Sequence, residues 1–347
     1  RGEWRTSIDV SICSPAAPAN LTGRSETASA VRRATAEQVL AGSPRVRTDW
    51  LPLVRTYEQS VVDAAALRHR PSLEAESSMP AAGLPWFMAV FGRDSIIMSL
   101  QSLPFAPSLA AATLEILGAR QGKRLDPFRD EEPGKILHES RIGELTAFAE
   151  RPHSPYFGTA DATPLFLVLL DEYELWTGDA ALVCRLEPEA RAALRWIDEY
   201  GDRMGNGYVS YQRRNEESGL ENQCWKDSWN SILFRDGSLS KLPRACCEIQ
   251  GYAYDAKVRC ARLARRFWND LALSDRLERE AAELKSRFNR DFWLPDRACF
   301  ALAIDGDGRQ VDSITSNIGH LLWSGIVDED KAPAVVRHLM DAELFSG

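Results

Sequence analysis

The sequence has 347 residues, of which 44% are hydrophobic, and 42 Lys and Arg stand against 50 Asp and Glu for a net charge of −8. A chain of this length and composition can bury a sizeable core in one large globular domain. It contains no dense basic run or basic stripe, so nucleic acid is not an expected partner. Apolar stretches such as residues 164–170 are far shorter than the roughly 20 residues that span a membrane, so no membrane partner is expected either.

The cysteine pattern favours a reducing environment. There are seven cysteines at irregular spacing, including the adjacent pair Cys246 and Cys247, and they match neither a disulfide framework nor a CxxC metal pattern. We therefore expect a cytoplasmic location. No metal or other cofactor is implied, because the sequence lacks HExxH, a Walker loop, GxGxxG and a Gly-x-Ser-x-Gly elbow.

Three regions follow one another along the chain. Residues 1–14 are predicted as a short strand that ends an N-terminal β domain, because a single strand is not stable alone. Residues 15–45 form a linker that is rich in Pro, Ala and Ser at its start, and helical periodicity dominates residues 46–347. Neither end carries a terminal signature, so we expect the sequence to be part of a longer polypeptide.

The helical region reads as a succession of paired helices. Thr177-Gly178-Asp179 ends one helix and starts another, and a hairpin turn at residues 305–308 separates two more. The long polar loops 121–155 and 206–243 lie between pairs, and such loops in helical domains are usually functional. Irregular spacing favours an all-α fold of the α/α toroid type over a solenoid. The predicted helices are 36–40, 50–68, 109–120, 163–176, 187–200, 250–268, 273–292, 313–326 and 331–340.

The first candidate site segment combines Trp86 with Arg93 and Asp94. An Asp accepts hydrogen bonds from paired hydroxyls, an Arg donates in a fixed fork, and an aromatic ring covers the apolar face of a sugar. The alternative is a structural Arg–Asp pair, with Asp94 and Ser95 capping a helix.

Two further segments surround the start of an apolar helix. Residues 128–139 hold three consecutive acids and would be a solvated charge run, but their three apolar side chains favour a folded loop. In residues 156–164, Asp161 or Thr163 would cap the helix, with Pro164 in its first turn. The same residues would point into a pocket if this helix lined one, and the two roles are compatible.

The fourth segment places Asp227 between Trp225 and Trp229. A glycosidase general acid must keep its proton near neutral pH, and burial between two indoles favours a protonated carboxyl. Lys226 would act in the opposite direction if it pointed inward. The alternative is a surface loop with tryptophans packed beneath it.

Two helix segments further along the chain carry polar side chains that could contact a ligand. Glu248, Gln250, Tyr252 and Tyr254 lie at the start of one helix, and His320 lies with Asn317 and Trp323 on another. A histidine such as His320, taken alone, is more typical of a core than of a catalytic site.

Together and in this order, seven motifs resemble the amylo-α-1,6-glucosidase family, glycoside hydrolases similar to the glucosidase part of glycogen-debranching enzymes, and more distantly the glucoamylases and trehalases. The motifs are PWF, FGRDS, RDEEPGKILHE, GTADATP, WKDSW, EIQGYAYDA and TSNIGHLLWSG. The resemblance covers residues 45–347. It implies an (α/α)6 six-hairpin barrel, incomplete at the C-terminus, after an N-terminal β-sandwich-like domain.

By position, the resemblance implies that Asp227 is the general acid and that Arg93 and Asp94 bind a terminal glucosyl residue with Trp86 against its ring. The other implied pocket residues are Glu131, His138, Thr159, Asp161, Trp225, Lys226, Glu248 and Gln250. Cys224 and Asn230 depart from the family pattern, where a Gly and an acidic residue are usual, and either change could alter the substrate.

The implied reaction is inverting hydrolysis of terminal α-glucosidic bonds in an α-glucan, oligosaccharide or glucoside. Its general base would be a Glu beyond residue 347, so the chain alone is expected to be inactive or nearly so. A non-catalytic carbohydrate-binding toroid is the main alternative. A sugar isomerase, which would need paired histidines, is the weakest one, because none of the five His pairs at i, i+4.

Overall fold

The computed structural model describes residues 41–71 and 77–345. The chain divides into two compact units, Arg1–Arg68 and His69–Gly347. The strand predicted at residues 1–14, the helix at 36–40 and most of the linker lie outside the described residues, so the predicted domain boundaries stay predictions. In the first unit, helix α2 (Leu51–Ala66) confirms the helix expected at residues 50–68.

The second unit is rich in helices, as expected. The strands are two residues long each: β2 (Met79–Pro80), β3 (Val90–Phe91), β4 (Glu139–Ser140), β5 (Ala245–Cys246), β6 (Trp293–Leu294), β7 (Cys299–Phe300), β8 (Ala303–Ile304) and β9 (Gln310–Val311), while β1 (Arg68–His69) lies at the boundary between the units. The helices are α3 (Arg93–Ser102), α4 (Pro107–Ala119), α5 (Glu144–Ala147), α6 (Ala162–Thr177), α7 (Ala180–Arg185), α8 (Glu187–Glu199), α9 (Cys247–Arg266), α10 (Leu271–Asp291), α11 (Ile318–Ser324) and α12 (Ala332–Leu339), with 3-10 turns at Pro127–Arg129 and Pro295–Arg297.

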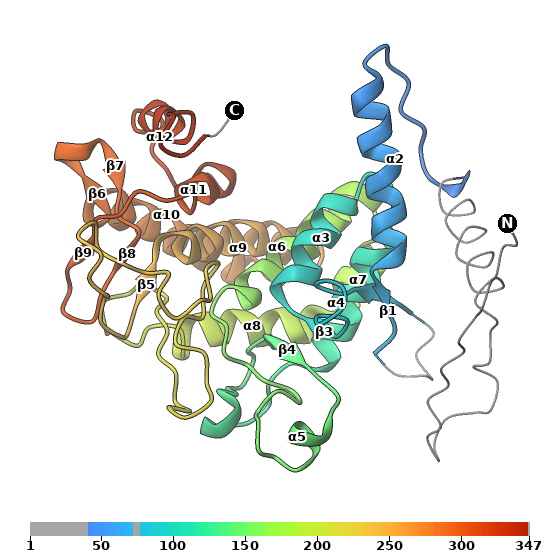
Figure 1. Cartoon of the computed structure of the whole chain (residues 1–347), viewed down its shortest axis with the longest axis horizontal. Coiled ribbons are helices and arrows are strands. Elements are labelled where there is room, and N and C mark those ends of the chain that lie inside the picture. The colour runs from blue at the N-terminus through green and yellow to red at the C-terminus, as the bar shows by residue number, and fades with distance from the viewer. Residues whose placement is uncertain (1–40, 72–76, 346–347) are drawn as a thin grey trace, which may run out of the picture. The chain divides into compact units, whose positions relative to one another are not determined.

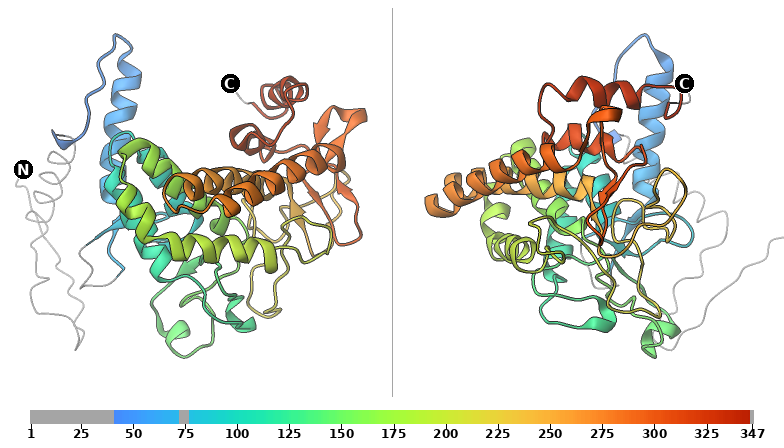
Figure 2. Two further views of the ribbon diagram at one scale, coloured as in Figure 1. Left: turned by 180° about the vertical axis from the view of Figure 1, so that it is seen from behind. Right: turned by 90° about the vertical axis from the view of Figure 1, so that its left-hand side faces the viewer.

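Consecutive helices pack as pairs, α3 with α4, α9 with α10 and α11 with α12. The long helices α9 and α10 run side by side in both views (Figures 1 and 2). The first members of the pairs also contact one another in the order α3, α6, α9 and α11. This series is the arrangement expected of the inner helices of a toroid. Closure into six hairpins stays a prediction.

Helix α6 is the central element of this arrangement. Its residues Ala162 to Asp171 are buried on all sides, because α6 packs on α3, α4, α8 and α9. It ends at Gly178, which adopts a left-handed φ of 70° and donates its N–H to the Glu174 carbonyl at 2.7 Å. Asp179 then caps α7 by accepting from the N–H groups of Ala181 and Leu182. The predicted helix break at residues 177–179 is confirmed.

Several helices differ from the sequence prediction. Helix α5 lies in a segment predicted as a loop, and α3 was considered only as the alternative in which Asp94 and Ser95 cap a helix, because Ser residues and an adjacent Ile pair obscure its period. Helix α11 begins at Ile318, five residues later than expected. Ahead of it, Ser313 Oγ donates to the Leu233 carbonyl at 2.6 Å and Thr315 Oγ1 to Asn317 Oδ1 at 2.8 Å. Such side-chain hydrogen bonds compete with helix formation.

The charged segment 128–139 is folded, as its apolar residues indicated. Ile136 and Leu137 are fully buried, and so is the Glu132 carboxylate. Trp196 Nε1 donates to that carboxylate at 2.8 Å, and Arg203 and Lys135 pair with it. Burial opposes ionisation, but Lys135 and Arg203 lower the pKa of Glu132 below its ordinary value. The Glu132 carboxylate therefore holds the loop together instead of facing solvent.

Strands β8 and β9 form the expected hairpin around residues 305–308. Strand β5 pairs with β8, so the three strands form one sheet in the order β5, β8, β9. Strands β3 and β4 form a second antiparallel pair, and β6 and β7 a third. Between Glu199 and Ala245 the structure has no helix or strand, as expected for the second long loop. Across residues 41–71 and 77–345, no helix has the length and apolar character needed to cross a membrane.

We expect a Gly92→Ala substitution to destabilise the fold by about 1–3 kcal/mol. Gly92 precedes α3, and an added Cβ would lie 2.1 Å from the backbone oxygen of Leu137 and 3.1 Å from Ala162 Cβ. Midpoints of urea unfolding measure the effect. A matched Gly83→Ala variant should unfold close to wild type, since its Cβ would meet nothing within 4 Å. Equal midpoints for the two variants would contradict the close approach at Gly92.

Candidate functional site

The N-terminal ends of four helices carry polar side chains that converge. Arg93 opens α3, Asp161 immediately precedes α6, Glu248 lies in the first turn of α9, and Asn317 immediately precedes α11. Helix N-termini bear partial positive charge, which favours carboxylates placed there. Loops before these helices supply the remaining side chains, including Asp227.

Arg93 is the centre of this cluster, and 9% of its side chain is exposed. Its Nη1 donates to Asp161 Oδ2 at 2.9 Å and to the Cys224 carbonyl at 2.6 Å, while Nη2 donates to Asp227 Oδ2 at 3.1 Å. Burial works against the charged guanidinium, but Asp161, Asp94 and Asp227 raise the pKa of Arg93 above its ordinary value. The guanidinium is therefore a permanent positive charge that joins three chain segments.

One interpretation of the sequence was that the Asp161 side chain caps α6. In the structure it makes no capping hydrogen bond. Its carboxylate is fully buried and instead accepts from Arg93 and, at 2.5 Å, from Thr159 Oγ1. Thr163 is engaged elsewhere, because its Oγ1 accepts from the Ile136 N–H at 2.9 Å. In this segment the side chains of Asp161 and Thr159 therefore face the cluster around Arg93.

The environment of Asp227 differs from the expected one. Its side chain is 43% exposed and pairs with Arg93, and Trp229 is 64% exposed. The expectation that two indoles enclose this carboxyl is therefore wrong for the structure described. Trp225 is partly buried and packs against His320, whereas Trp229 is exposed to solvent. Asp227 is accessible to a ligand and directly joined to the Arg93 cluster.

Glu248 is fully buried on the other side of Trp225. Its Oε1 accepts from the Trp225 N–H at 3.3 Å. Burial raises the pKa of Glu248, while the Asn317 side chain beside it opposes the shift. Glu248 thus fixes the loop that carries Trp225 and Asp227 to the start of α9.

His138 lies between the aromatic rings of Phe91 and Tyr156, with ring centroids 5.9 and 6.1 Å away. Its carbonyl accepts from the Gly92 N–H at 2.9 Å, which places it next to the start of α3. Burial, and then Arg93, lower the pKa of His138, so the ring stays neutral at neutral pH. The predicted role of His138 as a pocket residue stays a prediction.

A cavity of about 510 Å³ lies beside the cluster. The Trp225 ring forms part of its wall and packs against His320, with centroids 4.4 Å apart and ring planes tilted by 54°. Tyr252 Oη and His320 Nδ1 share a hydrogen bond of 2.7 Å. Burial, with Glu248 and Asp161, raises the pKa of Tyr252 well above its ordinary value, so its hydroxyl keeps its proton at neutral pH. Most of the other lining residues lie on helices α3, α6 and α11, namely Ile97, Leu100, Gln101, Glu172, Trp176, Gly319 and Trp323. Leu103, just after α3, and Ser316, just before α11, complete the lining.

Some of the expected pocket residues lie elsewhere. Gln250 is fully buried, and its amide is bonded to the backbone of Val209 and Cys246, so it clamps a loop and is not free for a ligand. Glu131 accepts from the Lys123 N–H and from Arg124, and these contacts hold the first long loop in shape. For both residues the contacts are structural, and the predicted pocket role has no support from the geometry.

The remaining expected residues lie at the rim. Trp86 is 78% exposed, and its carbonyl accepts from Arg141 at 3.2 Å. Asp94 is partly exposed next to Arg93 and contributes to the charge around that guanidinium. The Lys226 carbonyl accepts from Ser231 Oγ and the Cys224 thiol. No contact of these side chains fixes them to the cluster, so their binding roles stay predictions.

Of the residues that line the cavity, His320 and Trp323 were named from the sequence, whereas Glu172 and Trp176 were not, and helical spacing could have indicated them. Glu172 and Trp176 lie four residues apart on α6, and His320 and Trp323 three apart on α11, so each pair shares one helix face. Because α3 was not expected as a helix, Ile97 and Leu100 could not be grouped in the same way. A search for a Trp paired with a polar residue three or four positions earlier would have indicated the wall of the cavity.

No protein-family model matches the sequence, and no curated protein matches it. Solved structures that resemble it include two rhamnosidases. One is the GH78 family rhamnosidase of Bacillus sp. GL1, with a TM-score of 0.55 and 15% identity over 74% of this chain and 23% of that chain. The other is a rhamnosidase from Klebsiella oxytoca with rhamnose bound, with a TM-score of 0.57 and 16% identity over 86% of this chain and 49% of that chain.

At these identities the likeness concerns the fold. The chain spans about half of one of these rhamnosidase structures and about a quarter of the other. The helix-rich fold predicted from sequence is thus one that glycoside hydrolases use. Neither neighbour is named as an amylo-α-1,6-glucosidase, so that resemblance stays a prediction.

An Arg93→Met substitution should cost about 3–5 kcal/mol of unfolding free energy, because it leaves the buried Asp161 carboxylate without its ionic partner. Chemical denaturation measures the loss. Arg124→Met is a matched control, since the Arg124 side chain is 66% exposed and its pairs with Asp126 and Glu131 lie near the surface. That variant should lose less than about 1 kcal/mol. Similar losses for both variants would contradict the central role of Arg93.

The lowered pKa of His320, caused first by burial, predicts acid sensitivity. The unfolded chain takes up a proton near the ordinary His pKa of about 6.5, while the folded chain does not, so stability falls as pH drops below that value. His320→Gln should remove the contribution of His320 to the pH dependence of the unfolding free energy, which is at most about 1.4 kcal/mol per pH unit for one proton. Unfolding free energies at pH 7 and pH 5 measure it. Identical pH slopes for variant and wild type would contradict the neutral buried state of His320.

Proposed function

We propose that this chain is the sugar-binding and proton-donating part of a glycoside hydrolase that cleaves terminal α-glucosidic bonds by inverting acid/base hydrolysis. Asp227 is the general acid, and Arg93 and Asp94 bind the terminal sugar. The observation that carries the proposal is the Arg93 cluster, which holds the accessible Asp227 carboxylate two residues from Trp225, whose ring forms part of the wall of the cavity. The shared fold with two rhamnosidases supports the reaction class.

The geometry of Arg93 supports a division of work between its two terminal nitrogens. Nη1 is held by two buried acceptors, whereas Nη2 has the partly exposed Asp227 as its partner. A sugar hydroxyl can replace Asp227 at Nη2 without moving the buried half of the guanidinium. Binding would then release the Asp227 carboxyl, and a sugar covering it would favour the protonated form that a general acid requires.

The cavity beside the cluster suits the rest of a glycoside. Trp225, Trp176 and Trp323 offer apolar faces, and His320 and Glu172 offer polar groups among them. Aromatic faces with a few polar groups are typical of small-molecule sites. The Trp225 backbone links this wall to Glu248, so the wall and the acid belong to one rigid unit.

One observation favours a second candidate function, a non-catalytic carbohydrate-binding domain. The 43% exposure of Asp227 and its pair with Arg93 describe a carboxylate that could bind a sugar hydroxyl without transferring a proton. Both functions require sugar binding at Arg93. They differ in whether a bond is cleaved.

The decisive test combines binding and hydrolysis with a panel of aryl α-glucosides and α-rhamnosides. In the full-length polypeptide, which would supply the general base, we expect an α-glucoside to be hydrolysed and Asp227→Asn to lower kcat by about 100-fold or more while binding is retained, because a general acid contributes about 10²–10⁴-fold. Asp236→Asn is a matched control in the same long loop and should retain full activity. Binding without cleavage in both wild type and variant would support the second candidate. Unchanged turnover in Asp227→Asn would overturn the general-acid assignment, and preference for the rhamnoside would overturn the glucoside.

A further inference from the structure

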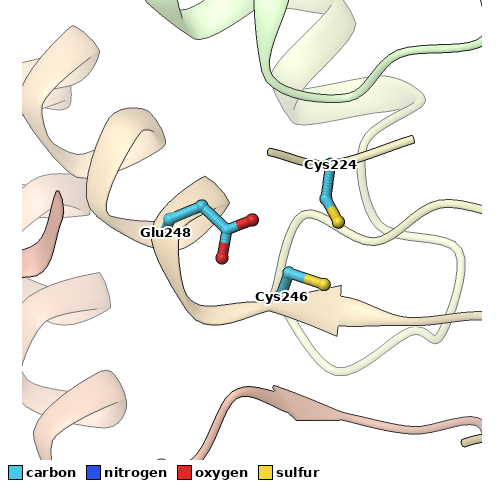
Figure 3. A group of neighbouring side chains, drawn as sticks. All are labelled: Cys224, Cys246 and Glu248. Atoms are coloured by element: carbon cyan, nitrogen blue, oxygen red, sulfur yellow. The ribbon is translucent and has the colours of Figure 1, made fainter. Parts of the chain in front are cut away.

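Three side chains that the reaction does not use point toward one another in the core. Cys224, Cys246 and Glu248 are all fully buried, and their ligand atoms lie within 4.8 Å of one another. Figure 3 shows Cys224 on the loop before Trp225, Cys246 at the end of β5 and Glu248 at the start of α9, with the sulfurs and the carboxylate facing a common space. The geometry points to a zinc site formed by the two thiolates and this carboxylate.

The donor set fits Zn²⁺ better than a harder cation. Thiolates are soft ligands that select zinc over magnesium or calcium, and a carboxylate completes a common zinc set. In a tetrahedral site with Zn–S bonds of about 2.3 Å, ligand atoms lie about 3.8 Å apart. Ligand atoms at most 4.8 Å apart therefore need their separations to shorten by about 1 Å, which is about 0.5 Å of movement for each atom and which side-chain rotation supplies.

The surroundings provide the supporting hydrogen bonds that a metal site needs. Tyr211 Oη lies 3.6 Å from Cys224 Sγ and 3.4 Å from Cys246 Sγ, so the two sulfurs and the Asn222 oxygen are alternative acceptors of its single proton. Tyr211 and Arg244 both bond to the same oxygen of Asn222, at 2.9 and 2.6 Å. The buried Arg244 guanidinium thus brings positive charge near a set of three anionic ligands. Such supporting contacts orient ligands and tune metal affinity.

Binding is a proton-for-metal exchange. Each thiol gives up its proton when its sulfur bonds to Zn²⁺, and three anionic ligands around a dication leave a single net negative charge. No electron is transferred. Three protein ligands leave the fourth tetrahedral position to a water molecule.

A metal at this place would connect the two segments that build the Arg93 cluster. The Cys224 carbonyl accepts from Arg93, and Glu248 accepts from the Trp225 N–H. Zinc would therefore pin the Trp225 and Asp227 loop to the junction of β5 and α9. The role is structural, and it stands independently of whether the protein cleaves glycosides.

The test is metal binding by the reduced protein after treatment with a chelator. Titration with Zn²⁺ against a chromophoric competitor should give one tight site per chain, and Co²⁺ substitution should give the charge-transfer bands of cobalt–thiolate bonds. Cys246→Ser and Glu248→Gln should each weaken Zn²⁺ affinity by about 10-fold or more. Cys260→Ser removes a buried thiol elsewhere on α9, and Cys184→Ser removes an exposed one, so both should bind as wild type does.

Co²⁺ spectra of the wild type decide the matter even if a ligand variant fails to fold, because they need no substitution. Absence of cobalt–thiolate bands in reduced wild-type protein would overturn the proposal. So would equal Zn²⁺ affinity in the ligand variants and the two controls. A Cys224–Cys246 disulfide, found by mass spectrometry in protein purified with Zn²⁺ present, would also overturn it.

Discussion

The buried guanidinium of Arg93 is the contact on which the site depends. One side chain joins the start of α3, the residue before α6 and the loop that carries Asp227. Because burying a charge is costly unless it is paired, these segments have to meet at fixed positions for the fold to be stable. The geometry of the site and the stability of the helical unit therefore have a common origin. A residue that binds substrate in our proposal is also one that the fold cannot easily lose.

The position of this contact follows from helix orientation. Inner helices that contact one another in the order α3, α6, α9 and α11 bring their N-terminal ends together, and each end contributes a polar residue. The partial positive charge of these ends favours the carboxylates Asp94, Asp161 and Glu248. Loops that reach the same end have to be long, which explains why the two long polar loops carry His138 and Asp227. Their length reflects the distance between helix pairs and the need to close over a cavity.

Sequence reasoning was most reliable where local rules decide structure. The helix break at Gly178 and Asp179, the hairpin around residues 305–308 and the central helix α6 follow from capping, turn chemistry and continuous hydrophobicity. Contacts between residues far apart in the sequence could not be predicted in this way. Nothing near Asp161 in the sequence indicates that its partner is Arg93, 68 positions away, and nothing near Gln250 indicates that loop backbone occupies its amide. Asp227 was found by motif order, while its exposure depends on where the Trp229 ring points.

The same limit explains why the cysteines gave no signal. A metal motif is recognisable in sequence when its ligands are closely spaced, as in CxxC, whereas Cys224 and Cys246 come from a loop and from the end of a strand. Strand β5 and the loop are brought together because β5 pairs with β8 and because Arg244, just before β5, pairs with Tyr211 through both backbone groups. Cys224 occupies the position where a Gly is usual in the family that the sequence resembles. A larger, soft side chain at that position contacts Tyr211 and faces Cys246, so the departure from the family pattern and the proposed zinc site concern the same side chain.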